Sequence, residues 1–447
     1  MIIINKEKVF EAVSFIASLF IVFLMIFGRN FTGIYLFGFR IGELIIGALV
    51  FLSFFFIAYA LTKKNRVFSF NTKNISLTFV SVVLFFFVSL FINNGNLVNT
   101  YSFKTSSYIW TIAIVFLILI FNLEKYLINK YILIVLPIVY FLNAIYFPNI
   151  FINFFTQNSD KFDFHKASDI LLIFIIMNLV CYTVFKDRFI PVVYLLFSFS
   201  ILNPLFLYMS KGSFFPSILF FIISIIIYSN IIKKHLGKTF IVLLISSILF
   251  ALSTYEVYGN FTFDKDAKPV EELSLLDPST FSSTYKSLSE TKNTTDIFAS
   301  LYIVDNRLFS TENLLNWRLQ IWQDVIDDLI DENKLIFGYG YNEIIPAMDS
   351  VDRRGTDGTN ENVHNYLINI LARGGVFQVF LILYIFYTVG KRSSFDLKFI
   401  NFVIAIFLVS SFDPSMETVR FPVIFYAYLT MFFVKNNHIY NRTSIES

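Results

Sequence analysis

The chain has 447 residues, of which 56% are hydrophobic and only 15% are charged. A soluble protein is typically about one quarter charged, so this composition excludes an ordinary soluble enzyme and predicts a membrane protein. The formal net charge of +3 comes with no basic stripe in the polar part of the chain, which argues against nucleic-acid binding. The single cysteine, Cys181, excludes a disulfide framework and a cysteine-based metal site.

Apolar runs dominate the chain, and most approach the length of roughly 17–25 residues that a helix needs to cross a bilayer. They occupy residues 9–28, 41–61, 75–92, 108–123, 131–150, 169–185, 190–208, 213–231, 239–254, 376–390, 399–412 and 421–434. The first run ends without a small-residue cleavage pattern, so we expect a span there and not a signal peptide. The predicted fold is an all-α polytopic membrane protein with about 12 transmembrane helices and one long, partly helical extracytoplasmic loop.

Basic residues predict the orientation of these runs. The segments on the side of the N-terminus hold 18 Lys and Arg residues, and the short segments on the opposite side hold 7. Cytoplasmic loops carry such an excess, so we expect both termini in the cytoplasm. The predicted parts are a transmembrane bundle of nine helices (1–254), an extracytoplasmic loop (255–374), three further transmembrane helices (375–434) and a cytoplasmic tail (435–447).

The extracytoplasmic loop is acidic, with 20 acidic and 10 basic residues, as expected of a solvated surface. We expect residues 255–311 to be irregular or partly helical. A helical repeat then predicts an amphipathic helix, with apolar positions at Leu315, Leu319, Trp322, Ile326 and Leu329.

Arg318 shares one face of this helix with Trp322, four positions later, whose ring is placed to hold the guanidinium by a cation–π contact. Arg318 is a candidate phosphate clamp, because guanidinium binds phosphate bidentately and keeps its charge. The alternative is an ion pair with a nearby aspartate, Asp324, Asp327 or Asp328.

Two glycine motifs follow along the chain. Gly338-Tyr339-Gly340 predicts a turn at positive φ with close backbone approach. A second helix is expected over 361–373, with Thr359 or Asn360 as its N-cap and Gly374-Gly375 as its end. His364 would lie one turn into that helix, where a neutral imidazole is a competent general base; the alternative is a structural histidine.

Further basic residues on the predicted outer side are secondary candidates. Lys211, in the short turn Ser210-Lys211-Gly212, is either an anion ligand or a snorkelling anchor. The remaining cations of interest are Arg353, Arg354, Arg373 and Arg420. We expect His165 at the surface and no metal site, because no His, Cys and carboxylate side chains cluster at ligand spacing.

Together these motifs resemble those of the O-antigen ligase and O-antigen polymerase superfamily of bacterial envelope enzymes. The resemblance covers residues 205–390 and rests on Arg318…Trp322, Gly338-Tyr339-Gly340, His364-Asn365…Leu367…Gly374 and a Ser-Arg-Gly-like turn at Ser210-Lys211-Gly212. It implies a glycosyltransferase of the bacterial inner membrane with its site on the extracytoplasmic side. The implied donor is an undecaprenyl-diphosphate-linked oligosaccharide, without cofactor or metal.

By this resemblance Arg318 would bind the donor diphosphate and His364 would serve the acceptor hydroxyl. Lys211 would replace the family's arginine, with a point charge in place of a bidentate fork. Trp322 and Asn365 are secondary candidates. We favour a repeat-unit polymerase; the alternative is a ligase that uses lipid A–core, and polysaccharide-assembly proteins are candidate partners. A transporter is less favoured, because the long loop falls between runs nine and ten and breaks any symmetry of two halves.

Overall fold

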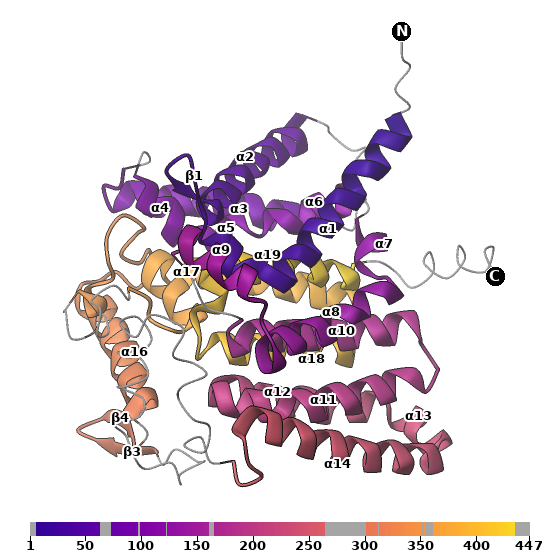
Figure 1. Ribbon diagram of the computed structural model, residues 1–447. Coiled ribbons are helices and arrows are strands. Elements are labelled where there is room, and N and C mark those ends of the chain that lie inside the picture. Colours follow the sequence, from indigo (N-terminus) through magenta and orange to yellow (C-terminus); the bar gives the residue numbers. More distant parts are fainter. Residues whose placement is uncertain are drawn as a thin grey trace.

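A computed structural model describes residues 6–62, 73–96, 99–121, 123–160, 165–263, 301–311, 313–349, 353 and 361–433. The fold is an all-α bundle with two small hairpins among these residues, and the predicted class of all-α polytopic membrane protein is confirmed. Figure 1 shows most bundle helices lying roughly side by side, with the described parts of the polar insert, residues 255–374, at one end of them.

Seven helices of the described residues are long and apolar enough to cross a membrane. They are α1 (Lys6–Thr32), α2 (Ile41–Thr62), α3 (Lys73–Ile92), α10 (Ala167–Val184), α11 (Ile190–Met209), α14 (Leu236–Tyr258) and α17 (Tyr366–Arg392). The segment Lys130–Ile145 and α9 (Asn149–Asn158) form one more span if this pair, bent by 84°, is counted together.

The predicted number of about 12 spans is therefore not confirmed, although every predicted apolar run contains helix. Several runs fold as short or broken pieces: α5 (Ser107–Trp110), α6 (Ala113–Phe121), η1 (Lys130–Ile134), α8 (Val135–Tyr140), η2 (Phe141–Ile145), α12 (Lys211–Ile227), α13 (Ser229–Lys234), α18 (Leu397–Ser410), α19 (Arg420–Leu429) and η8 (Thr430–Phe432). Two further short helices, α4 (Thr100–Thr105) and α7 (Glu124–Leu127), lie between the predicted runs. One break lies before α9, where Pro148 is the N-cap. Proline disfavours helical backbone in the residue before it, so the preceding helix ends there.

Helix α10 is the centre of the bundle. Its side chains are buried from Ala167 to Cys181, and it packs against α8, α11, α12, α18 and α19. By contrast, only 22% of the apolar window of α14 is buried, as expected of a helix that faces lipid. The N-terminal ends of α10, α12, α17 and α19 and the C-terminal ends of α11, α14 and α18 lie at the end of the bundle near the insert (Figure 1).

The insert contains a hairpin and a helix. Strands β3 (Leu301–Val304) and β4 (Arg307–Ser310) pair antiparallel, with Leu301 opposite Ser310. Helix α16 (Asn313–Asp331) packs on β4 and on α17, and it runs across the ends of bundle helices (Figure 1). The predicted amphipathic helix is confirmed, whereas the hairpin was not predicted.

A second, smaller hydrophobic core holds the insert together. Of the predicted apolar positions only Leu329 is fully buried, and it lies on a stripe with Ile321 and Val325. These three side chains pack with Ile345, Met348, Val363 and Ala372. This core fixes α16 against the start of α17, which positions the candidate site.

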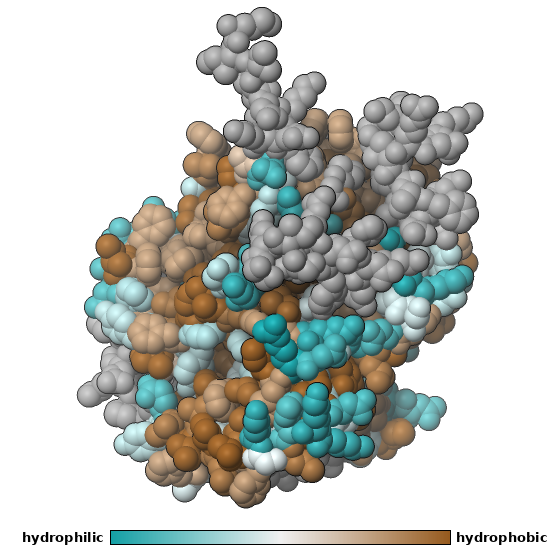
Figure 2. All heavy atoms as spheres, turned by 90° about the vertical axis from the view of Figure 1, so that its right-hand side faces the viewer, coloured by the Kyte–Doolittle hydropathy of each residue, from teal (hydrophilic) through white to brown (hydrophobic). Residues whose placement is uncertain are grey.

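The opposite end of the bundle carries exposed lysines. Helix α13, which includes Lys233 and Lys234, lies there (Figure 1), and both side chains are exposed, as are Lys186 and Lys391. Figure 2 views the molecule from that side and shows hydrophobic surface interrupted by hydrophilic patches. A second hairpin joins α1 to α2, with strands β1 (Tyr35–Leu36) and β2 (Phe39–Arg40).

Candidate functional site

Trp322 links three parts of the site. Its Nε1 donates a hydrogen bond to the carbonyl oxygen of Val363 at 2.7 Å, and its ring lies 6.2 Å from that of Phe412. These contacts, rather than the predicted cation–π contact with Arg318, hold the indole. Trp322 therefore ties α16 both to the residue before His364 and to the turn between α18 and α19.

His364 precedes the observed helix, although the sequence predicted it one turn inside a helix over 361–373. Helix α17 begins at Tyr366, with Asn365 as N-cap, whose side chain accepts from the backbone N–H of Leu367 (3.1 Å) and Ile368 (3.2 Å). The predicted start at residue 361 is wrong, because Asn365 satisfies the free donors of the first turn. The proposed caps Thr359 and Asn360 lie outside the described residues. His364 itself has φ of 56°, a conformation that is uncommon for residues other than glycine and is concentrated at functional sites.

The surroundings of His364 strongly disfavour its protonated form. Its ring contacts the edge of Trp317 with centroids 5.3 Å apart. Burial, followed by the positive charges of Arg318 and Lys166, lowers the pKa of His364 to about 3, and Asp413 only partly opposes this. The imidazole is therefore neutral at pH 7, and the structure brings Arg318 and His364 into one electrostatic neighbourhood.

The turn that carries Lys211 packs against the same α18–α19 turn. Lys211 is exposed and is the first residue of α12. A Cβ atom at Gly212 would lie 3.1 Å from the Cβ of Phe412, so the Gly212 backbone lies close to the Phe412 side chain. Phe412 thus lies between the Lys211 turn and Trp322 of α16. Nothing in the sequence analysis singled out this phenylalanine.

Asp413 adds a carboxylate to this end of the bundle. Its Oδ2 lies 3.8 Å from Nζ of Lys166, and its Oδ1 accepts a hydrogen bond from the Ser168 hydroxyl at 3.2 Å. Lys166 and Ser168 lie at the start of α10. Asp413 was not a candidate from the sequence, because an aspartate in a short turn between two apolar runs has no distinguishing spacing.

Glu417 is a second carboxyl group that the sequence analysis missed. It ends the short helix η7 (Pro414–Glu417), and its Oε1 is buried without a hydrogen-bond partner in the part of the chain that the structure describes. Burial raises the pKa of Glu417 to about 8, against the opposing charge of Arg373. The carboxyl is therefore mostly protonated at pH 7.

Arg373 holds the glycine turn in place. Its side chain is 3% exposed, and its Nη1 donates to the carbonyl oxygens of Gly340 (3.4 Å) and Glu343. In return the backbone N–H of Gly340 donates to the carbonyl of Arg373 at 3.0 Å. The predicted secondary ligand thus acts as a clamp on the loop after α16, with its guanidinium 5.8 Å from the ring of Tyr101.

The glycines confirm the predicted positive φ and close approach. Gly338 and Gly340 have φ of 69° and 83°. Gly375 has φ of 70°, and a Cβ there would lie 2.1 Å from the carbonyl oxygen of Ile336. The predicted helix end at Gly374-Gly375 is confirmed as a break, because Gly375 has non-helical backbone angles; a second helical stretch follows it directly and continues to Arg392.

Arg353 is engaged in an ion pair on α16. Its Nη2 lies 2.5 Å from Oδ2 of Asp324, and Arg307 binds the other oxygen of that carboxylate. Asp324, one of the three aspartates considered as alternative partners for Arg318, thus already holds two arginines. Arg354, the neighbouring candidate, lies outside the described residues.

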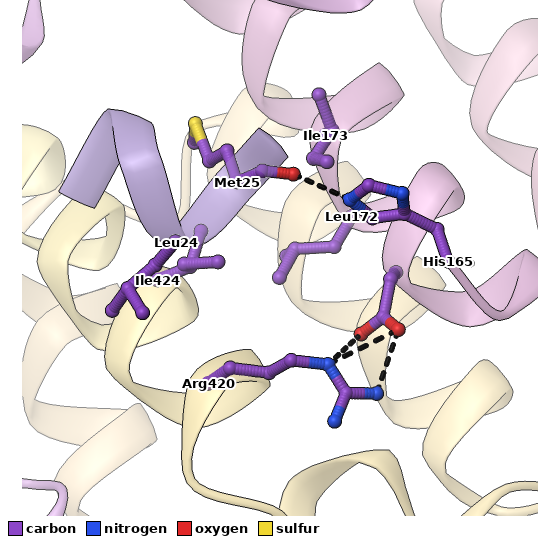
Figure 3. A pocket seen from close by; sticks show the side chains of 8 residues that line it. Leu24, Met25, His165, Leu172, Ile173, Arg420 and Ile424 are labelled. Atoms are coloured by element: carbon purple, nitrogen blue, oxygen red, sulfur yellow. Dashed lines mark hydrogen bonds and ion pairs between the residues drawn. The ribbon is translucent and has the colours of Figure 1, made fainter. Parts of the chain in front are cut away.

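Arg420 and His165 each form buried hydrogen bonds that join neighbouring helices (Figure 3). Arg420 makes a bidentate pair with Asp169 of α10, with Nε–Oδ1 at 3.1 Å and Nη2–Oδ2 at 2.7 Å. His165 is 7% exposed and bonds the carbonyl of Met25 in α1 at 2.7 Å through Nε2, so its predicted surface position is wrong. Its Nδ1 accepts from the amide of Asn143 at 3.0 Å. These partners assign Arg420 to packing of α1, α10 and α19, not to an open anion site.

Part of the chain matches a known protein family. Residues 195–383 match the family model described as O-antigen ligase, and this stretch contains Lys211, Arg318 and His364. No curated protein matches the chain. The predicted family resemblance is therefore confirmed.

Proposed function

From the O-antigen ligase domain at residues 195–383 in a multi-pass membrane protein, we propose a glycosyltransferase whose donor is an undecaprenyl-diphosphate-linked glycan. The domain assigns O-antigen ligase or polymerase-type glycan transfer in surface polysaccharide synthesis. The observation that carries the assignment to residues is the shared neighbourhood of Arg318 and His364, on two elements joined by the Trp322–Val363 hydrogen bond.

Arg318 and Lys211 are the proposed ligands of the donor diphosphate. Both belong to elements that meet at Phe412, one through Trp322 and the other through Gly212. Negative charge grows on the diphosphate as the sugar leaves it. Fixed cations stabilise that transition state more than the ground state, which is the requirement for catalysis.

His364 is the proposed base for the acceptor hydroxyl. The hydroxyl oxygen forms a bond to the anomeric carbon, the bond from that carbon to the phosphate oxygen breaks, and its electron pair leaves with undecaprenyl diphosphate. The hydroxyl proton passes to the imidazole, and a single displacement inverts the anomeric centre. Such base catalysis contributes about 10²–10⁴-fold.

The low pKa of His364 links this step to donor binding. An imidazole with a pKa of about 3 is neutral at pH 7 but holds a proton only weakly. The diphosphate opposes the charges of Arg318 and Lys166, two causes of the low value, so bound donor raises the pKa of His364 toward that of a useful base. The base would therefore become effective when the donor is present.

Cationic side chains at the diphosphate lead us to propose a metal-independent reaction. We expect the purified enzyme to keep its glycan-transfer rate in excess EDTA, because Arg318 and Lys211 supply the positive charge. Rate measurements with and without EDTA, followed by addition of Mg²⁺ or Mn²⁺, test this. Loss of activity in EDTA with recovery upon adding one cation would contradict it.

The proposed acceptor is the glycan end of another lipid-linked repeat unit, which makes the protein a polymerase. An insert with 20 acidic and 10 basic residues is poorly suited to a phosphorylated lipid A–core, because like charges repel. Ligation to lipid A–core is the second candidate, favoured by the description of the matching family. The proposed location is the bacterial inner membrane with the site facing outward, supported by exposed lysines at the opposite end.

Deletion of the gene, followed by gel analysis of surface and carrier-linked glycans, tests these alternatives. A polymerase mutant makes no polymer on the lipid carrier. A ligase mutant instead accumulates carrier-linked polymer. Unchanged surface glycan in the deletion strain would contradict both.

A further inference from the structure

Lys166 is a cation at the candidate site that has no assigned role. It precedes α10, at the same end of the bundle as α16 and the start of α17 (Figure 1). Its only ion pair among the described residues is the loose contact with Asp413 at 3.8 Å, and 36% of its side chain is exposed. An exposed pair at this distance is weak, so a more highly charged anion competes for Lys166 effectively.

Contacts on the α18–α19 turn place Lys166 beside the proposed donor site. Asp413, its partner, directly follows Phe412, which touches Trp322 of α16 and Gly212 beside Lys211. The positive charges of both Lys166 and Arg318 lower the pKa of His364. Lys166 therefore lies at the meeting point of the elements that carry the three proposed site residues.

We propose that Lys166 is a third cationic ligand of the donor diphosphate, and that it exchanges Asp413 for a phosphate oxygen when the donor binds. Asp413 keeps the hydrogen bond from Ser168 at 3.2 Å after the exchange, so its carboxylate retains a donor. A third cation also suits a site in which Lys211 supplies one rotatable ammonium group rather than a planar fork. This inference rests on the proposed function.

Binding of undecaprenyl diphosphate to the full-length protein in nanodiscs of neutral phosphatidylcholine tests the proposal. We expect Lys166→Gln to weaken binding by about tenfold, as for loss of one charge-assisted contact, and Lys166→Arg to retain most of the affinity. Lys334→Gln is the matched control, because Lys334 also pairs with a single carboxylate, in its case Glu332 at 3.0 Å and not Asp413. We expect the control to bind like the wild type.

The outcomes separate this inference from the proposed function. Wild-type protein that binds no undecaprenyl diphosphate would overturn the donor assignment, and with it the role of Lys166. Tight binding by the wild type with equal binding by Lys166→Gln would overturn the inference alone. Adding phosphatidylglycerol to the nanodiscs should leave the difference between the two proteins in place. Loss of the difference would mean that Lys166 recognises bilayer headgroups instead, which also overturns the inference.

Discussion

His364 illustrates at the residue scale how the fold changes the chemistry of a side chain. A histidine in a solvated loop would ordinarily titrate near pH 6.5. Here burial and two neighbouring cations lower the pKa to about 3, and Asn365 rather than His364 takes the capping position. His364 therefore lies outside the helix, with a positive φ and a neutral imidazole.

Substitutions at the proposed pair should separate binding from chemistry. We expect His364→Ala to lower kcat by about 10²–10⁴-fold with roughly unchanged donor affinity, because a base acts in the transition state. Arg318→Lys keeps the charge but loses the fork, so we expect about a tenfold lower kcat/KM. Steady-state kinetics at matched expression, with Lys334→Gln as control, measures both. Normal glycan product from His364→Ala would remove that residue from the catalytic mechanism.

Glu417 should make stability depend on pH in a defined window. Its folded-state pKa of about 8 lies above the ordinary value of 4.5 for a glutamate, so its contribution to stability is complete below pH 4.5 and is lost as pH rises to about 8. His364 acts oppositely: its depressed pKa makes stability fall as pH drops from 6.5 toward 3. The two effects overlap between pH 4.5 and 6.5, which leaves pH 6.5–8 as the window for Glu417.

In that window we expect wild-type stability to fall with rising pH, by at most about 1.4 kcal/mol per pH unit, the value for one proton. Glu417→Gln, which mimics the protonated carboxyl, should show a flatter profile. Thermal unfolding of both proteins in detergent at several pH values measures this. Parallel profiles for the two proteins would contradict a raised pKa.

At the scale of elements, the kink in α17 decides how the insert meets the bundle. The backbone of 335–340 crosses α17 at Gly374-Gly375, with the N–H of Tyr339 bonded to the carbonyl of Ala372 at 2.7 Å. Ser89 of α3 donates to the carbonyl of Phe337 at 2.9 Å and fixes the crossing from the other side. A straight helix with larger residues would leave no room for this crossing.

Gly375→Ala should therefore be strongly destabilising. The new Cβ would overlap the Ile336 carbonyl at 2.1 Å, and the residue would keep a positive φ. We expect a loss of at least about 2 kcal/mol, from backbone strain and overpacking together. Gly47→Ala in α2 is the matched control, because nothing lies within 4 Å of its added Cβ. Thermal stability and monodispersity in detergent report the effect, and equal values for the two variants would contradict the crossing.

At the scale of the whole molecule, the orientation in the membrane is open to direct measurement. We expect Ile303→Cys in β3, which is 72% exposed, to react with an impermeant maleimide in intact spheroplasts. Lys391→Cys, at the other end of α17, should react only after lysis, because basic segments stay in the cytoplasm. Both variants carry Cys181→Ala, since Cys181 is the one native cysteine. The reverse labelling pattern would invert the proposed topology.

The sequence by itself determined the class of fold and the resemblance to the O-antigen ligase family. Long apolar runs can satisfy their backbone hydrogen bonds in a bilayer only as helices, so hydropathy alone predicted the bundle. The glycines of Gly338-Tyr339-Gly340 predicted positive φ, because that conformation is a local property of the backbone. The spacing of apolar residues likewise predicted α16. The buried face differs from the predicted one, because Ile321 and Val325 are buried and, of the predicted positions, only Leu329 is.

Only the tertiary structure decided which cations are engaged by partners within the protein. Arg353, Arg373 and Arg420 looked equivalent in sequence, yet Asp324, the carbonyls of Gly340 and Glu343, and Asp169 engage them respectively. Asp413, Glu417 and Lys166 had no sequence signature. These residues come together only because helix ends from distant parts of the chain meet in the fold. Ser168 and Asp413, for example, are hydrogen-bonded although they lie about 250 residues apart in the sequence. Pairing of charges depends on such distances in space, and local periodicity carries no information about them.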